Sequence, residues 1–353
     1  MVRQTKKINK MIPIKNIYYM LSYAFSVLQE QGYKELGNES FDNVGDLFSA
    51  ILYRGIVMQL KQGIHKDYIT VTEKTSTLKG KINYTESVYN QTMRSAMMIC
   101  EYDDYSEDSY LNRILKTAIL YLLKSDVSPS RKKDLRKIII YFKDIKELDH
   151  HQINWHIRYN RNNRTYAMLI AICNMLFKSL IQNQEDGSSR LMDYIDERQM
   201  HKLYEKFILE FYKKERTDIK SSASQIDWIL DDDNNDYLPV MQSDITLHTG
   251  NDILIIDAKY YRKSMQIYYD KTTFHSGNLY QLFTYVKNKQ EYLNRYSKGQ
   301  VSGMLLYAKT DESVTPNNNT MVMSGNRIIV HSLDLNRDFS DMKKELLEMA
   351  DSF

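Results

Sequence analysis

Apolar residues recur at two different spacings along the chain, and in the first half most of them follow the period of a helix. From Ile14 to Leu28 they fall three or four positions apart, as on one buried helix face, and Pro13 suits the first turn because its missing N–H needs no partner there. Further helices are predicted at 41–60, 110–123 and 166–180, and a helix or helix–strand unit is predicted at 130–146. Short alternating runs predict strands at 68–71 and 78–82, so this half has mixed α and β character.

The pattern changes after residues 182–190, a polar stretch with Asp186-Gly187-Ser188 that is typical of a linker. The elements predicted beyond it are a helix, three strands, a helix, a strand, a further strand and a closing helix, over Asp196–Glu215, Ile226–Leu230, Leu238–Leu247, Ile253–Tyr260, Asn278–Gln290, Val301–Ala308, Arg327–Leu333 and Ser340–Met349. Three consecutive strands form a meander and the next helix crosses over to another strand, which predicts a mixed sheet. We therefore predict an α+β fold with two domains, 1–190 and 191–353.

Composition narrows the possible classes of protein. The length of 353 residues suits two domains, and 48 basic against 45 acidic residues gives a net charge of +3, too balanced to name a partner. Two cysteines 73 positions apart cannot form a disulfide framework or a zinc cluster, which predicts a cytoplasmic protein. No apolar run reaches about 18 residues, so no membrane span is expected. The sequence contains no GxxxxGK[ST] motif and hence no P-loop.

Candidate chemistry is concentrated in the stretch from Gln242 to Lys259. Gly250-Asn251 suits a two-residue hairpin turn, and that turn fixes a register in which paired residue numbers sum to 501. Asp244 then lies opposite Asp257, at the roughly 5 Å Cβ separation of directly paired residues, and Gln242 lies beside Lys259. Because strand side chains alternate, Asp257 and Lys259 project from the same face.

Two carboxylates this close repel each other unless a cation lies between them. Hard oxygen ligands suit Mg²⁺, and a lysine beside them can hold a water molecule or a phosphate oxygen. The set Asp244, Asp257 and Lys259 therefore predicts metal-assisted phosphodiester hydrolysis. From spacing alone, a hairpin with ordinary surface charges explains the pattern equally well.

The stretch from Asp244 to Asp257-Ala258-Lys259 resembles the active-site signature of PD-(D/E)xK nucleases, and the predicted element order is similar to their core. The signature's proline is absent at position 243, with Pro239 nearby. Gln281 and Tyr285 resemble the QxxxY helix motif of several such nucleases, and at this spacing they share one helix face. The resemblance also makes Glu205, in the first predicted helix after the linker, a possible accessory metal ligand.

Other blocks of the chain are similar to the McrC family, the nuclease subunit of McrBC-type restriction systems that act on modified DNA such as 5-methylcytosine DNA. They are Ile12-Pro13-Ile14-Lys15-Asn16-Ile17-Tyr18-Tyr19-Met20-Leu21-Ser22-Tyr23-Ala24, Leu78-Lys79-Gly80-Lys81-Ile82, Leu111-Asn112-Arg113-Ile114-Leu115, Tyr204-Glu205-Lys206-Phe207, Asp257-Ala258-Lys259-Tyr260-Tyr261 and Asn278-Leu279-Tyr280-Gln281-Leu282. The resemblance implies a partner, McrB, a ring-forming AAA+ GTPase that binds GTP and recognises modified double-stranded DNA. It further implies that this chain docks on the ring, stimulates GTP hydrolysis and cuts DNA with Mg²⁺ as cofactor.

Two alternatives to the nuclease subunit stay open at this point. The chain could be a non-catalytic adaptor that only stimulates the GTPase ring, or a standalone structure-specific nuclease. The roughly 190 residues before the nuclease-like part argue against a standalone enzyme. We expect the N-terminal domain to dock on the ring, with Tyr68–Tyr84 as the candidate docking hairpin.

Overall fold

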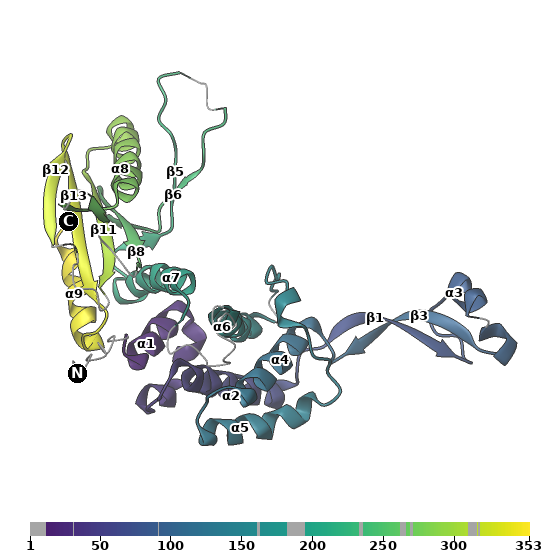
Figure 1. The fold of residues 1–353 in the computed structure, drawn as a ribbon. Coiled ribbons are helices and arrows are strands. Elements are labelled where there is room, and N and C mark those ends of the chain that lie inside the picture. Colours follow the sequence, from purple (N-terminus) through teal and green to yellow (C-terminus); the bar gives the residue numbers. More distant parts are fainter. Residues whose placement is uncertain are drawn as a thin grey trace. The chain divides into compact units, whose positions relative to one another are not determined.

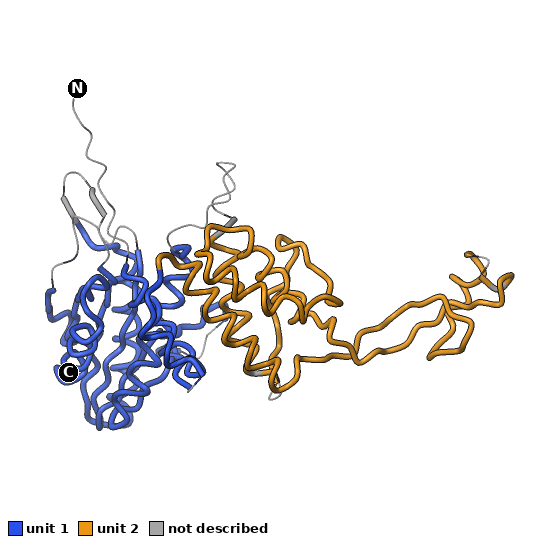
Figure 2. The backbone as a smooth tube through the Cα atoms, turned by 90° about the horizontal axis from the view of Figure 1, so that it is seen from below, with its two compact units in different colours: residues 1–41, 193–353 blue, residues 42–192 orange. Residues whose placement is uncertain are grey.

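A computed structural model describes residues 12–30, 32–90, 92–160, 163–181, 195–232, 236–261, 266–268, 271–309, 316 and 318–353. The chain forms two compact units, which are coloured separately in Figure 2. One contains residues 42–192, and the other combines residues 1–41 with 193–353. The predicted boundary at residue 190 lies close to the second division. The start of the chain, however, belongs to the C-terminal unit and not to the predicted N-terminal domain 1–190.

Long-range contacts explain why the start of the chain belongs there. Helix α1 (Ile14–Ala24) packs on α7 (Glu197–Glu215). The Asn16 side-chain amide donates to the backbone carbonyls of Leu335 and Arg337, both at 2.8 Å, and the Tyr23 hydroxyl donates to Glu215 at 2.6 Å. These partners lie far away in the sequence, so the local pattern of residues 12–41 does not reveal which unit they join.

The unit formed by residues 42–192 is a helical body that carries a β-strand arm. The body contains α2 (Val44–Gln62), α4 (Tyr110–Lys124), α5 (Pro129–Ile139) and α6 (Arg164–Ile181). Side chains cap two of these helices, because Asn43 accepts from the Asp46 N–H and Ser109 from the Asn112 N–H. Pro129 occupies the first turn of α5, which ends earlier than the predicted helix 130–146.

The arm projects from this unit as a long two-stranded antiparallel ribbon (Figures 1 and 2). Strand β1 (Asp67–Thr75) pairs along its whole length with β3 (Met98–Ser106), and the tip carries β2 (Lys81–Ile82) and α3 (Tyr84–Tyr89). The predicted hairpin Tyr68–Tyr84 is therefore wrong, because both of its strands pair with β3 and not with each other. At Gly80 the backbone has φ +61°, and an added Cβ would lie 2.5 Å from the Glu101 carbonyl oxygen, so the tip requires glycine.

The second unit is built on a six-stranded mixed sheet in the order β12-β13-β11-β8-β7-β4. Its strands are β4 (Lys220–Ser222), β7 (Ile245–Thr249), β8 (Asp252–Lys259), β11 (Val301–Lys309), β12 (Asn319–Met323) and β13 (Asn326–Asp334). The β8, β11 and β13 strands run parallel, whereas the β4–β7, β7–β8 and β12–β13 pairs are antiparallel. The predicted mixed sheet is thus confirmed.

Two details of the predicted meander are wrong. The strand beside β7 is β4, and the predicted strand Ile226–Leu230 contributes only to a separate two-stranded ribbon. That ribbon joins β5 (Gln225–Ile226) to β6 (Met241–Gln242) outside the main sheet. A further two-stranded ribbon joins β9 (Gln266–Tyr268) to β10 (Lys271–Thr273).

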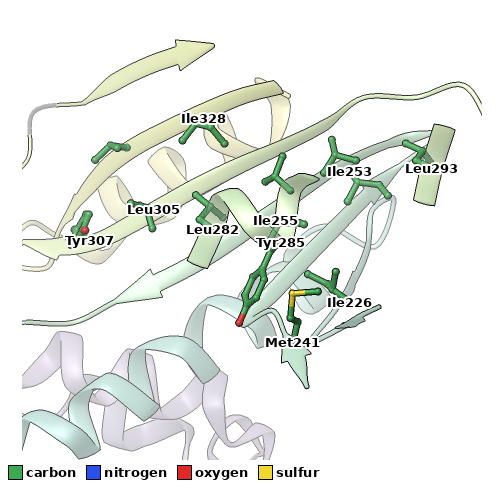
Figure 3. Close-up of a cluster of buried hydrophobic side chains, with 13 residues drawn as sticks. Ile226, Met241, Ile253, Ile255, Leu282, Tyr285, Leu293, Leu305, Tyr307 and Ile328 are labelled. Atoms are coloured by element: carbon green, nitrogen blue, oxygen red, sulfur yellow. The ribbon is translucent and has the colours of Figure 1, made fainter. Parts of the chain in front are cut away.

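Helices cover both faces of the sheet. Helix α8 (Ser276–Tyr296) packs on the face that carries Ile253 and Ile255, and this apolar cluster is drawn in Figure 3. Gly303 allows the close approach of α8, because an added Cβ would lie 2.7 Å from a Val286 methyl carbon. Helices α7 and α9 (Phe339–Asp351) cover the other face, where Tyr212 donates to the Leu346 carbonyl at 2.9 Å. None of the helices in the described ranges is long and apolar enough to cross a membrane.

Candidate active site

The hairpin between β7 and β8 brings the two predicted aspartates together. Paired residues run from Thr249 with Asp252 to Ile245 with Ile256, which is the predicted register, and Gly250 adopts φ +59° in the turn. Asp244 is the residue before Ile245 and lies immediately beyond the last of these pairs. One of its carboxylate oxygens accepts the backbone N–H of Ala258 at 2.9 Å, which fixes it beside Asp257.

The predicted neighbour of Lys259 across the hairpin is wrong. Gln242 leaves the main sheet and pairs with Gln225 in the β5–β6 ribbon. The hairpin ladder therefore ends near Asp244, and the chain turns away at the point where the carboxylates meet.

Asp257 and Lys259 form a buried ion pair. The Lys259 ammonium lies 3.0 Å from Oδ1 of Asp257, and the two residues are 8% and 2% exposed, respectively. The other oxygen, Oδ2 of Asp257, is buried and has no hydrogen-bond partner among the described residues. Burying a carboxylate oxygen without a hydrogen-bond partner costs folding free energy, so this oxygen is suited to bind a ligand that is not part of the chain.

Burial disfavours the ionised forms of both acids, and the negative charge of Asp257 adds to this effect at Asp244. Burial, with the charges of Asp257 and Glu205, raises the pKa of Asp244 to about 7, and burial raises the pKa of Asp257 against the lowering effect of Lys259. Burial alone would lower the pKa of Lys259, but the two carboxylates outweigh it and raise that pKa. One lysine thus faces three acidic groups, and a divalent cation would balance the remaining charge.

Glu205 joins this group from helix α7, and His201 holds it in place. Nδ1 of His201 accepts the backbone N–H of Tyr260 at 3.3 Å, which leaves the ring proton on Nε2. That Nε2 lies 2.9 Å from Oε1 of Glu205 and donates to it. The sequence indicated Glu205 as a possible ligand, whereas His201 was not predicted, although its i, i+4 spacing from Glu205 on one helix was a usable signal.

Gln281 and Tyr285 lie on α8, which covers the face of the sheet that carries Asp257. The Gln281 amide donates to the Tyr285 hydroxyl at 2.9 Å, and Tyr285 is part of the buried cluster in Figure 3. Among the described residues no hydrogen bond joins either of them to Asp257. Their hydrogen bond lies within α8, and only Tyr285 belongs to the cluster that packs against the sheet. A catalytic role for the two residues stays a prediction.

A hydrogen-bonded chain that the sequence did not predict runs beside Lys259. The Tyr261 hydroxyl donates to the side-chain oxygen (Oδ1) of Asn278 at 3.3 Å, and the side-chain amide of Asn278 donates to the Tyr307 hydroxyl at 3.2 Å. Tyr307 pairs with Lys259 across β11 and β8. These groups come from three separate segments, so no local motif could have revealed them.

Comparison with known proteins places this chain in a family. The model of the McrBC 5-methylcytosine restriction system component matches residues 4–308. The chain belongs to this family. A curated relative from Escherichia coli (strain K12), the type IV methyl-directed restriction enzyme EcoKMcrBC, is 29% identical over 350 residues, which cover 97% of this chain and 98% of the relative.

Two solved structures from Thermococcus gammatolerans are more distant. A refined half-complex from a tetradecameric assembly of McrB AAA+ hexamers with bound McrC matches with a TM-score of 0.49 and 15% identity, over 96% of this chain and 76% of that chain. The McrBC complex matches with a TM-score of 0.39 and 18% identity, over 59% of this chain and 60% of that chain. Membership in the McrBC family therefore rests on sequence.

Proposed function

We propose that this McrBC-family chain is the DNA-cutting subunit of a modification-dependent restriction complex, with a PD-(D/E)xK active site at Asp244, Asp257 and Lys259. The observation that carries the proposal is a half-buried Asp244 beside a buried Asp257, which has an unsatisfied oxygen, and a buried Lys259. Such a pair destabilises a hairpin unless it serves a cation. An adaptor without catalytic activity would have no use for it.

The residues present fit Mg²⁺. Asp244 and Asp257 would hold the ion, and Glu205 is close enough to act as an accessory ligand, since its charge already raises the pKa of both aspartates. When bound, Mg²⁺ polarises a phosphate group and lowers the pKa of a coordinated water molecule.

The chain itself contributes charge and orientation to the reaction. The Lys259 ammonium, fixed 3.0 Å from Asp257, can orient the attacking water or neutralise charge that develops on the phosphate oxygens. The Ala258 N–H and the His201 ring keep the Asp244 and Glu205 carboxylates in position. The reaction is thus hydrolysis of a phosphodiester in double-stranded DNA that carries modified bases.

The family also suggests the partner, a ring-forming AAA+ GTPase of the McrB type that binds GTP and selects modified DNA. This division fits a chain whose sequence contains no P-loop. The arm of β1 and β3 is suited to docking on such a ring, because it extends away from its unit and exposes apolar side chains at its tip. They are Leu78, Tyr84, Val88 and Tyr89, each at least 60% exposed.

The experiment is cleavage of 5-methylcytosine DNA by the complex of this chain with its GTPase partner. We expect Asp257→Ala and Lys259→Met to abolish cutting while GTP hydrolysis is still stimulated. Asp252→Asn is the matched control on the same strand, because its side chain accepts the Gln300 N–H at 2.9 Å and an amide can do the same. Undiminished cutting by Asp257→Ala would reject the assignment, and a wild-type complex that stimulates GTP hydrolysis but never cuts would favour the adaptor.

A further inference from the structure

A cavity of about 360 Å³ opens directly beside the acidic site, between helix α7 and the segment that joins β6 to β7. It shares Glu205 and Asp244 with the acidic site, so whatever occupies it lies against the group that would hold the metal. Its walls include Lys202, Glu205 and Lys206 on the helix and Gln242, Ser243 and Asp244 on the strand side.

Two of these residues are lysines, and the nearby charge of Glu210 acts on Lys206. Lys202 and Lys206 are exposed, and within the part of the chain that the structure describes neither ammonium forms an ion pair. The Lys206 ammonium lies 3.8 Å from the centre of the Phe25 ring, a cation–π contact that holds it at the cavity wall without neutralising it. The positive charge of both lysines is therefore available to a ligand.

The spacing of the two lysines points to a repeating anion. They stand four residues apart on one helix face, about 6 Å along the helix axis, which is comparable to the distance between neighbouring phosphates of a nucleic-acid strand. Glu205 lies between them in the sequence and faces the acidic site. A strand lying along α7 would bring two phosphates to the lysines in the cavity that Asp244 also lines.

We propose that this cavity binds the sugar–phosphate backbone of the DNA strand next to the bond that is cut, with Lys202 and Lys206 each neutralising one phosphate. The proposal rests on the proposed nuclease function and assigns the path of the strand through the site. An acidic peptide would match the charge of the lysines. It would not explain why they adjoin a site suited to phosphodiester hydrolysis.

The test measures binding of a short DNA duplex to the full-length chain by fluorescence anisotropy across a range of salt concentrations. Asp257→Asn serves as the background, so that the DNA stays intact with Mg²⁺ present. Lys202→Gln and Lys206→Gln are tested as single variants and as a double variant. The control is Lys344→Gln on α9, where the side chain is 78% exposed. Because each lysine that neutralises a phosphate contributes about 0.9 to the slope of log K against log salt, the double variant should lose about 1.8 of that slope.

The outcomes separate this proposal from its alternatives. The proposal is supported if the slope of log K against log salt becomes smaller in the Lys→Gln variants, returns with Lys202→Arg and Lys206→Arg, and does not change in the control. An unchanged slope in the double variant overturns it, even when the wild-type complex cuts DNA. Normal DNA binding with lost stimulation of the partner's GTPase would assign the lysines to protein docking and also overturn it. Loss of cutting in Asp257→Ala is required by the proposed function, whichever result the lysines give.

Discussion

Replacement of Asp244 by asparagine should stabilise the metal-free protein at neutral pH, against the usual effect of a mutation at a half-buried polar site. The pKa of Asp244 rises from its ordinary value of 3.8 to about 7, because of burial and the nearby charges of Asp257 and Glu205. Ionising this group in the folded chain therefore costs up to about 4 kcal/mol of folding free energy at pH 8. Asparagine can still accept the Ala258 N–H and carries no charge.

The sign of the pH dependence follows from the same pKa. A carboxyl group whose pKa is higher in the folded state binds its proton more tightly there. Its stabilising contribution is therefore complete below about pH 4 and is lost as the pH rises to about 7. Without metal, the wild-type protein should lose stability across this range, and Asp244→Asn should lose much less.

Mg²⁺ should reduce the stability difference between the two proteins. A ligand that binds only the folded state at one hundred times its Kd adds about 2.7 kcal/mol of stability, and we expect this gain in the wild type but not in Asp244→Asn. Urea unfolding with EDTA or Mg²⁺ measures both effects. The chain has two tryptophans, Trp155 and Trp228, and Trp155→Phe leaves Trp228 as a reporter in the unit that holds the site. The reasoning is refuted if Asp244→Asn is less stable than the wild type in EDTA at pH 8, or if Mg²⁺ stabilises both equally.

Three further predictions test the arm, the sheet and the support of Glu205. Replacing residues 68–105 by a short Gly-Ser linker should abolish stimulation of the partner's GTPase. The helical body should stay folded, as measured by circular dichroism, because Asp67 and Ser106 are paired neighbours that a short linker can join. Retained stimulation would exclude the arm as the docking element. Gly303→Ala should lower the free energy of unfolding in urea by about 1–3 kcal/mol, because its Cβ would lie 2.7 Å from a Val286 methyl carbon. Adding Val286→Ala should recover part of that loss. An unchanged free energy of unfolding in Gly303→Ala would contradict the packing of α8. His201→Ala should weaken Mg²⁺ binding about 10–100-fold by releasing Glu205, and unchanged affinity in calorimetry would show that Glu205 needs no such support.

The sequence predicted the centre of the site because its geometry is local. A glycine turn and side-chain alternation sufficed to place Asp244 beside Asp257 and Lys259 near both. Strands with little pattern of their own escaped prediction. Strand β4 is only three residues long, and the second half of β3, from Tyr102 to Ser106, consists of acidic and hydroxyl-bearing residues, so neither shows apolar alternation.

Long-range partnerships were the other limit of the sequence. Asn16 bonds to a carbonyl 319 residues away, which places α1 in the C-terminal unit although nothing nearby in the sequence indicates it. His201 supports Glu205 only because its second ring nitrogen meets the backbone of Tyr260, 59 residues later. Such contacts depend on how elements pack, and side-chain spacing within one element carries no information about them.

The central claim is that Asp244 and Asp257 together hold one divalent cation. Isothermal titration of Mg²⁺, and of Mn²⁺ as a second probe, into the metal-free full-length chain tests it most directly. We expect saturable binding to the wild type and to Asp252→Asn, and loss of that binding in Asp257→Asn. The same isotherm for wild type and Asp257→Asn would contradict it.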